Sequence, residues 1–303
     1  MGVAMLMVIA YHFALHFGLY HSPLIVRGDI GVDIFFFLSG YGCCFSASKH
    51  SSRVFYTNRI KRIMPIYLII GTLTIFANYV FLNQDLSTID IYRIFCISFF
   101  THDDLSVWYI HASLLFYLFT PFIIEMFNKC GFKIYYYLTL CLVVVIYLCI
   151  YFHHPNINLM LYRFVSYLLG IICARFALKK LEIRGKNIIF GGGIWYLLLM
   201  FVLQIFLKKQ DMLVHNQLRY IIYPVLMMVM VHFCIKYLPK NKYLFWIGLC
   251  SLECYLAHQP IMNYLSNIQN NILFFACSTI AIIVCVIFFH YINKKMTIFI
   301  NHK

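Results

Sequence analysis

Two histidines near the start of the chain have the side chain and the spacing of residues that transfer protons. His12 and His16 are four residues apart in an apolar segment, so on a helix they share one face. A neutral imidazole there can act as a general base at pH 7, and His12 is our candidate. Spacing alone leaves two alternatives: a pair of hydrogen-bonded core histidines, or metal ligands. No third ligand follows at a recognisable spacing, so we expect no metal.

Three more ionisable residues lie within apolar segments. Asp33 belongs to GVDIFFFLSG (31–40), and Glu253 and His258 belong to SLECYLAHQP (251–260). Ionisable groups in hydrocarbon are costly, so they are usually functional or paired. Asp33 could orient an imidazole, as carboxylates do in proton relays. The alternative is an ion pair with a nearby basic residue such as Arg27.

A basic pair lies in the segment FYTNRIKRIMP (55–65), which we expect to be the loop into a third span. Arg59 and Arg62 are three residues apart, so on a helical turn both guanidinium groups face one way. Arginine binds phosphate through two parallel hydrogen bonds, which makes this pair a candidate phosphate site. The alternative is a juxtamembrane cluster that anchors the topology or binds anionic lipid.

The composition shows which elements must position these residues. Of the 303 residues, 63% are hydrophobic and 11% are charged, against about 25% charged residues in a soluble domain. A soluble enzyme is therefore excluded. The sequence predicts an all-α, polytopic membrane bundle formed by a single domain, 1–303. About ten windows are long and apolar enough to span a bilayer: 2–20, 30–47, 63–82, 107–127, 133–152, 159–178, 187–207, 218–236, 243–263 and 272–292.

The net charge of +14 is explained by topology. Most Lys and Arg residues lie in alternate joints, after the second, fourth, sixth and eighth windows and in the C-terminal tail. Basic residues gather in cytoplasmic loops, so both termini are expected in the cytoplasm. The same reasoning removes nucleic acid as a partner and leaves the lipid bilayer. We expect the first window to be a retained span, because it has no basic leader and no small-residue cleavage site.

Four segments together resemble the bacterial membrane-bound acyltransferase-3 family. They are AYHF (10–13), GVDIFFFLSG (31–40), the FxxxRxxRIxP pattern (55–65) and SLECYLAHQP (251–260). The segment from Trp108 to Pro121 is also similar to a later family pattern. The likeness covers nearly the whole chain, and the family likewise has ten membrane helices.

The resemblance implies an O-acyltransferase of the bacterial plasma membrane. Such enzymes move an acyl group, usually acetyl, from cytoplasmic acyl-CoA to a hydroxyl of an extracytoplasmic glycan or glycolipid. His12 matches the proposed family base. In the mechanism that we expect, Asp33 stabilises its imidazolium or fixes its tautomer. Arg59 and Arg62 match the family pair associated with the donor, so acetyl-CoA or another acyl-CoA is the expected cosubstrate.

The chain departs from the family pattern at two places. The family usually has an arginine eleven residues before the histidine, where this sequence has Met1. Two expectations remain open: the natural chain begins upstream of Met1, or the protein lacks this arginine. Many members also have a glutamate near Ser113 and Leu114, so no catalytic role transfers to that position. A transporter or flippase for a lipid-linked saccharide is the alternative function, although we find no inverted repeat.

Overall fold

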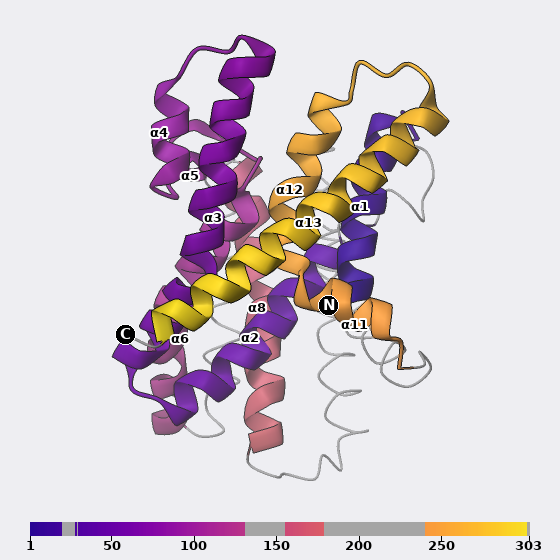
Figure 1. Ribbon diagram of the computed structural model, residues 1–303. Coiled ribbons are helices and arrows are strands. Elements are labelled where there is room, and N and C mark those ends of the chain that lie inside the picture. The colour runs from indigo at the N-terminus through magenta and orange to yellow at the C-terminus, as the bar shows by residue number, and fades with distance from the viewer. Residues whose placement is uncertain (20–27, 29, 131–154, 179–239, 302–303) are drawn as a thin grey trace, which may run out of the picture. The chain divides into compact units, whose positions relative to one another are not determined.

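The computed structural model describes residues 1–19, 28, 30–130, 155–178 and 240–301, and every regular element in these ranges is a helix (Figure 1). Four helices are long and apolar enough to cross a membrane. They are α2 (Ile30–Lys49), α3 (Ser52–Leu82), α6 (Trp108–Cys130) and α13 (Asn271–Asn301). α1 (Gly2–His16) is a shorter apolar helix. The prediction of a helical membrane protein is therefore confirmed.

The number of spans stays a prediction. The windows 133–152, 187–207 and 218–236 lie outside the described residues. The window 159–178 corresponds to α8 (Pro155–Leu178). The cytoplasmic placement of both termini also remains a prediction.

One predicted span and one predicted loop are corrected. The window 243–263 is not one helix but two, α11 (Lys242–Leu249) and α12 (Ser251–Tyr264), which break at Cys250. The break follows Gly248, and glycine is a poor helix former. The segment 55–65 is not a loop, because α3 begins at Ser52 and already includes it.

The described helices form two compact units. Unit 1 comprises Met1–Gly31, His50–Pro121 and Lys240–Lys303, and unit 2 comprises Val32–Lys49 and Phe122–Pro239. Unit 1 therefore contains α1, α3, α6 as far as Pro121, and α11 to α13. Two short helices, α4 (Thr88–Ile94) and α5 (Ser98–His102), also belong to it.

Side-chain contacts give the helix directions in unit 1. The hydroxyl of Tyr56, near the start of α3, donates to the Leu118 carbonyl at 2.8 Å. Farther along α3, the Tyr67 hydroxyl lies 3.2 Å from His111 Nε2. Residue numbers rise along α3 as they fall along α6, so the two helices are antiparallel.

The helix α1 runs alongside α11 and α12. Its Met1 sulfur lies 3.9 Å from the Ser251 hydroxyl at one end, and its C-terminal half reaches the C-terminal half of α12. Glycine permits the close approach at the start of α1, since a Cβ on Gly2 would clash with the Leu244 carbonyl. This close packing at the start of α1 fixes its position along α11 and α12. It therefore determines which residues of α12 lie beside the C-terminal half of α1.

In unit 2, the helices α2 and α8 also approach each other closely through glycines. A Cβ on Gly40 of α2 would clash with the backbone of Tyr167, and one on Gly170 of α8 would clash with the backbone of Phe37. Small residues let membrane helices pack backbone to backbone. This packing brings the first half of α2 against the middle of α8.

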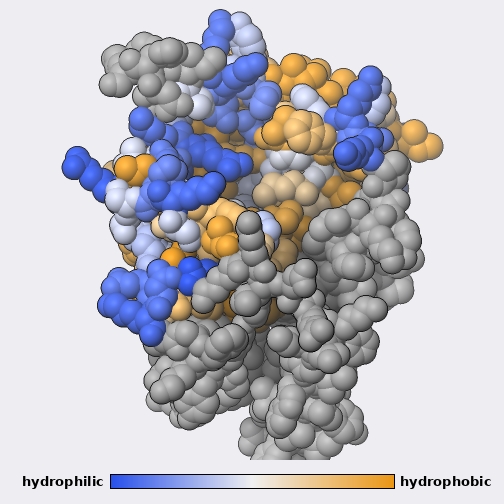
Figure 2. All heavy atoms as spheres, turned by 90° about the horizontal axis from the view of Figure 1, so that it is seen from below, coloured by the Kyte–Doolittle hydropathy of each residue, from blue (hydrophilic) through white to orange (hydrophobic). Residues whose placement is uncertain are grey.

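Charge is sorted between the two ends of unit 1. Basic residues gather where α3 and α11 begin and α13 ends, and hydrophilic side chains cover much of the described surface seen from below (Figure 2). Carboxylates gather in the segment between α3 and α6. The basic set is Arg53, Arg59, Lys61, Arg62, Lys240, Lys242, Lys294 and Lys295, and the opposite set contains Asp85, Asp90, Asp103 and Asp104 with Arg93.

Candidate functional site

The imidazole of His12 lies against the C-terminal half of α12. Its ring centroid is 4.9 Å from that of His258, with the planes inclined at 56°. The side-chain amide of Gln259 lies 3.3 Å from His12 Nδ1. The orientation of an amide is assigned from its partners, so Gln259 can either donate to Nδ1 or accept from it. When it accepts through Oε1, it leaves Nε2 of His12 with the lone pair that a general base needs.

The second imidazole has a defined tautomer. Nδ1 of His258 lies 3.0 Å from the Cys254 carbonyl and 2.8 Å from the Tyr255 carbonyl. Carbonyl oxygens only accept, so Nδ1 carries a proton and donates it. In the neutral ring, Nε2 then holds a lone pair. This atom is buried and has no hydrogen-bond partner among the described residues.

The other predicted histidine of α1 has different surroundings. The ring of His16 stacks on Phe274 of α13, with centroids 3.8 Å apart and planes inclined at 12°. His16 therefore packs against the first turn of α13, whereas His12 faces α12. The two histidines share the helix but not the contacts.

The basic pair lies in the early turns of α3. The Arg59 guanidinium lies 5.4 Å from the Phe55 ring centroid and 5.7 Å from that of Tyr117. Both are cation–π distances. Its Nε is buried without a hydrogen-bond partner among the described residues. Arg62 is exposed one turn later. Aromatic rings therefore hold Arg59 without neutralising its charge, which suits an anion-binding group.

The structure places Asp33 in unit 2, where it forms a buried ion pair. Its carboxylate accepts from Arg163 Nη1 and from the Ser166 hydroxyl, the latter at 2.7 Å. The side chains of Asp33 and Arg163 are 1% and 2% exposed. The structural alternative raised by the sequence is therefore present, with Arg163 as the partner. Arg27 lies outside the described residues, and an effect of Asp33 on His12 stays a prediction.

Glu253, a buried carboxylate of unit 1, is also paired. Asn293 of α13 donates to Glu253 Oε1 at 2.7 Å, and His290 Nδ1 lies 3.4 Å from the same oxygen. Glu253 is 2% exposed. These contacts join α12 to α13 and satisfy the expectation that an intramembrane charge is functional or paired.

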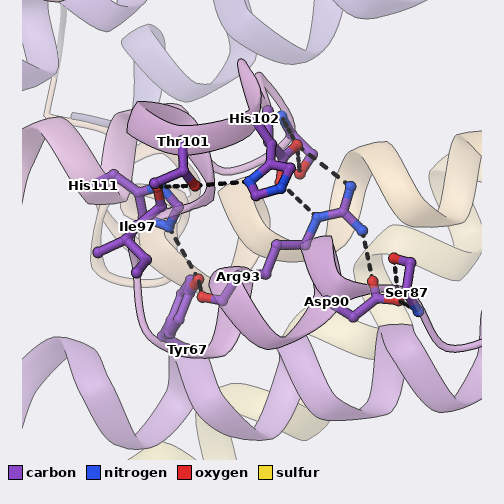
Figure 3. Close-up of polar contacts among 10 residues, drawn as sticks. Tyr67, Ser87, Asp90, Arg93, Ile97, Thr101, His102 and His111 are labelled. Carbon is purple, nitrogen blue, oxygen red and sulfur yellow. Dashed lines mark hydrogen bonds and ion pairs between the residues drawn. The ribbon is translucent and has the colours of Figure 1, made fainter.

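An ion-pair network organises the segment between α3 and α6 (Figure 3). Arg93 donates through Nε to Asp104 at 2.6 Å and through Nη1 to Asp90 at 3.0 Å. The Tyr67 hydroxyl donates to the Arg93 carbonyl. Burial alone would raise the pKa of Asp104, but hydrogen bonds from Arg93 and Ser106 and the charge of Arg93 outweigh it. The pKa is lowered to about 2.

A cavity of about 350 Å³ lies in unit 1 between α3, α12 and this segment. Gln259 lines it, and the same side chain contacts His12. The cavity therefore approaches His12 from the end of unit 1 that carries the carboxylates.

Sequence reasoning missed two sets of partners. Gln259 lies in SLECYLAHQP (251–260), but its contact with His12 cannot be inferred from that motif, because it depends on how the distant segments α1 and α12 pack. Arg163, the partner of Asp33, lies inside the apolar window 159–178. Its presence in an apolar helix was a usable signal, because a buried cation needs a carboxylate partner.

Comparison with known proteins agrees with these observations. A family model described as an acyltransferase domain matches residues 2–291. No curated protein and no solved structure matches the chain at the required significance. The match covers nearly the whole sequence, including His12 and the Arg59–Arg62 pair. This membrane protein belongs to the acyltransferase-3 family.

Proposed function

We propose that the protein transfers an acyl group, most simply acetyl, from cytoplasmic acyl-CoA to a hydroxyl of an extracytoplasmic glycan or glycolipid. The observation that carries the proposal is the presence in unit 1 of both groups the reaction needs. His12 is held beside Gln259 and His258, and Arg59 has no carboxylate partner among the described residues. The bacterial plasma membrane is the proposed location.

The basic pair would bind the phosphates of the donor. The Arg59 guanidinium lies near two aromatic rings, and a phosphate can accept two of its N–H groups at once. Exposed Arg62 adds a second cation one turn along α3. The family match supports an acyltransferase, and the charge of this pair supports a phosphate-bearing donor such as acyl-CoA.

In the proposed reaction, the acyl group moves from the thioester sulfur of acyl-CoA to the hydroxyl oxygen of the acceptor. His12 takes the proton of the acceptor hydroxyl as its oxygen attacks the thioester carbonyl. A new bond forms between the acyl carbon and the acceptor oxygen, and the bond between the acyl carbon and the CoA sulfur breaks. The imidazolium of His12 then gives its proton to the CoA thiolate. A route through an acyl-enzyme is the alternative sequence of steps.

We also propose that Asp33 contributes by stabilising the imidazolium that forms at His12. Its ion pair with Arg163 and the hydrogen bond from Ser166 hold the carboxylate in one orientation. The same pair gives Asp33 a structural role in unit 2. No observation favours the transporter over the acyltransferase.

The test compares two histidines of one helix. In lipid nanodiscs with radiolabelled acetyl-CoA and cell-surface glycan as acceptor, His12→Ala should lower kcat by about 10²–10⁴-fold, the usual contribution of a general base. His16→Ala is the matched control, because it removes an imidazole one turn away that stacks on Phe274. It should keep most of the activity. A His12→Ala variant that transfers at the wild-type rate contradicts the assignment.

A further inference from the structure

The cavity of unit 1 has no role in the donor chemistry described above. It measures about 350 Å³, which is near the lower end of the range of small-molecule sites, about 300–1,000 Å³. Its inner wall includes Gln259, whose amide lies 3.3 Å from His12 Nδ1. A molecule in the cavity would therefore be one side chain away from the proposed base.

The lining combines apolar side chains with uncharged polar groups and is nearly neutral. Hydroxyl and amide groups come from α3 and α12, including Thr74, Asn78, Asn263 and Tyr264. Of the described residues that line it, Arg93 alone is charged, and its guanidinium is bound by Asp90 and Asp104. Such a wall offers hydrogen bonds without a strong charge, which fits a neutral polyhydroxylated molecule better than an anion.

A glycine of α3 leaves space in this wall. Gly71 lies in the interior of a 31-residue helix and lines the cavity. Glycine is unfavourable inside a helix, and it is often kept where another backbone or a ligand approaches closely. At Gly2, Gly40 and Gly170 a neighbouring backbone would clash with an added Cβ, but at Gly71 a Cβ would meet nothing within 4 Å. No described protein group explains the missing side chain at this position.

We propose that this cavity binds the sugar residue of the acceptor, with its ring against Gly71 and its reacting hydroxyl toward Gln259 and His12. The proposal rests on the function proposed above and names its acceptor subsite. The cavity would recognise an uncharged sugar ring and its hydroxyl groups, which a hexose presents equally on a free glycan and on a lipid-linked glycan. Gly71 is a position where side-chain size sets acceptor affinity.

The test fills the space at Gly71. A leucine there places its side chain in the cavity, so the KM for the acceptor should rise by about tenfold or more, with little change in the KM for acetyl-CoA. Gly71→Ala should have a smaller effect in the same direction. Gly42→Leu is the matched control, since it also lies in a helix where a Cβ meets nothing within 4 Å, but it does not line the cavity.

Two kinds of acceptor are compared, to show whether the sugar is recognised free or attached to a lipid. One uses neutral methyl hexosides, and the other uses the same hexoses attached to a polyprenyl phosphate. Equilibrium binding of tritiated methyl hexosides is measured in parallel, because it needs no acyl transfer. Sugar binding that is lost in Gly71→Leu and kept in Gly42→Leu supports the proposal in either arm.

Equal sugar binding and equal acceptor KM values in the wild type and Gly71→Leu overturn the proposal. Failure of the proposed function looks different, because the wild type would then transfer no acyl group although its sugar binding still responds to Gly71. Thermal unfolding of each variant distinguishes a filled cavity from a misfolded protein.

Discussion

At the scale of single residues, the unpaired charges differ sharply from the paired ones. Asp33 and Glu253 are buried with specific partners, whereas Arg59 rests on two rings and has no carboxylate among the described residues. A buried ion pair contributes little to stability as a whole, but removing one partner is costly. The paired carboxylates are therefore expected to respond to mutation through folding, and the arginines through ligand binding.

The first prediction concerns the donor pair. Arg59→Ala together with Arg62→Ala should raise the KM for acetyl-CoA, because the variant loses two cations that would contact phosphate. S-acetylpantetheine lacks these phosphates, so kcat/KM for that donor should be nearly unchanged. Arg53→Ala, an exposed arginine of the same helix, is the control. An equal loss with both donors would instead indicate that the arginines anchor the helix.

The second prediction separates the two roles of Asp33. Asp33→Asn leaves Arg163 buried without its counter-charge, so the free energy of unfolding should fall by about 3–5 kcal/mol. The double variant with Arg163→Gln should recover part of this loss. Thermal unfolding in detergent gives the stability, and kcat per folded molecule gives the catalytic effect. Unchanged stability with a reduced kcat would contradict the structural role and support the catalytic one.

At the scale of helices and segments, the sequence predicted that a helix exists more accurately than it predicted where the helix begins and ends. Apolar runs in the sequence predict the helices α1, α2, α6 and α13, of which α1 is shorter than a span. The helical start of α3 was missed because its charged residues do not look like a span, although nothing prevents them from continuing a helix into water. The break at Cys250 was missed because the residues on both sides of it are largely apolar, so the window 243–263 resembles one continuous span.

The same limit applies to the site. His12, Arg59 and Arg62 could be selected from residue type and spacing, because the chemistry is carried by single side chains. The contact of His12 with Gln259 joins residues 247 positions apart. Periodicity within one helix contains no information about such a pair. The cavity beside Gln259 was unpredictable for the same reason.

A third prediction follows for the segment between α3 and α6. The pKa of Asp104 is lowered in the folded protein, so its stabilising contribution is complete above about pH 4 and is lost as the pH falls toward 2. The protection factors for hydrogen exchange across 83–107, which correct for the intrinsic pH dependence of exchange, should therefore fall over this interval. Asp104→Asn should exchange faster at neutral pH and lose this pH dependence. An unchanged pH profile in the variant would contradict the role of the ion pair.

At the scale of the whole molecule, the sorting of charge supports one orientation in the membrane. The basic end of unit 1 is expected in the cytoplasm and the carboxylate end outside, which places Arg59 where acyl-CoA is available. The cavity approaches His12 from the opposite end. Donor and acceptor would thus reach unit 1 from opposite sides of the bilayer.

The fourth prediction tests this orientation. An epitope tag inserted after Asp85 should be cleaved by protease added to intact spheroplasts, and a tag after Lys303 should be protected until the membrane is permeabilised. Immunoblotting against both tags gives the result. Protection of the inserted tag would reverse the topology, and with it the assignment of donor and acceptor sides.

The length of α3 links the protein to the thickness of its membrane. Its 31 residues extend for about 46 Å, whereas a bilayer has a hydrocarbon core of about 30 Å. Several turns must therefore lie among the lipid headgroups unless the helix tilts. The early turns carry Arg59 and Arg62, so bilayer thickness sets how deeply this pair lies among anionic headgroups that compete for the same guanidinium groups. Donor affinity should accordingly depend on acyl-chain length and on the fraction of anionic lipid.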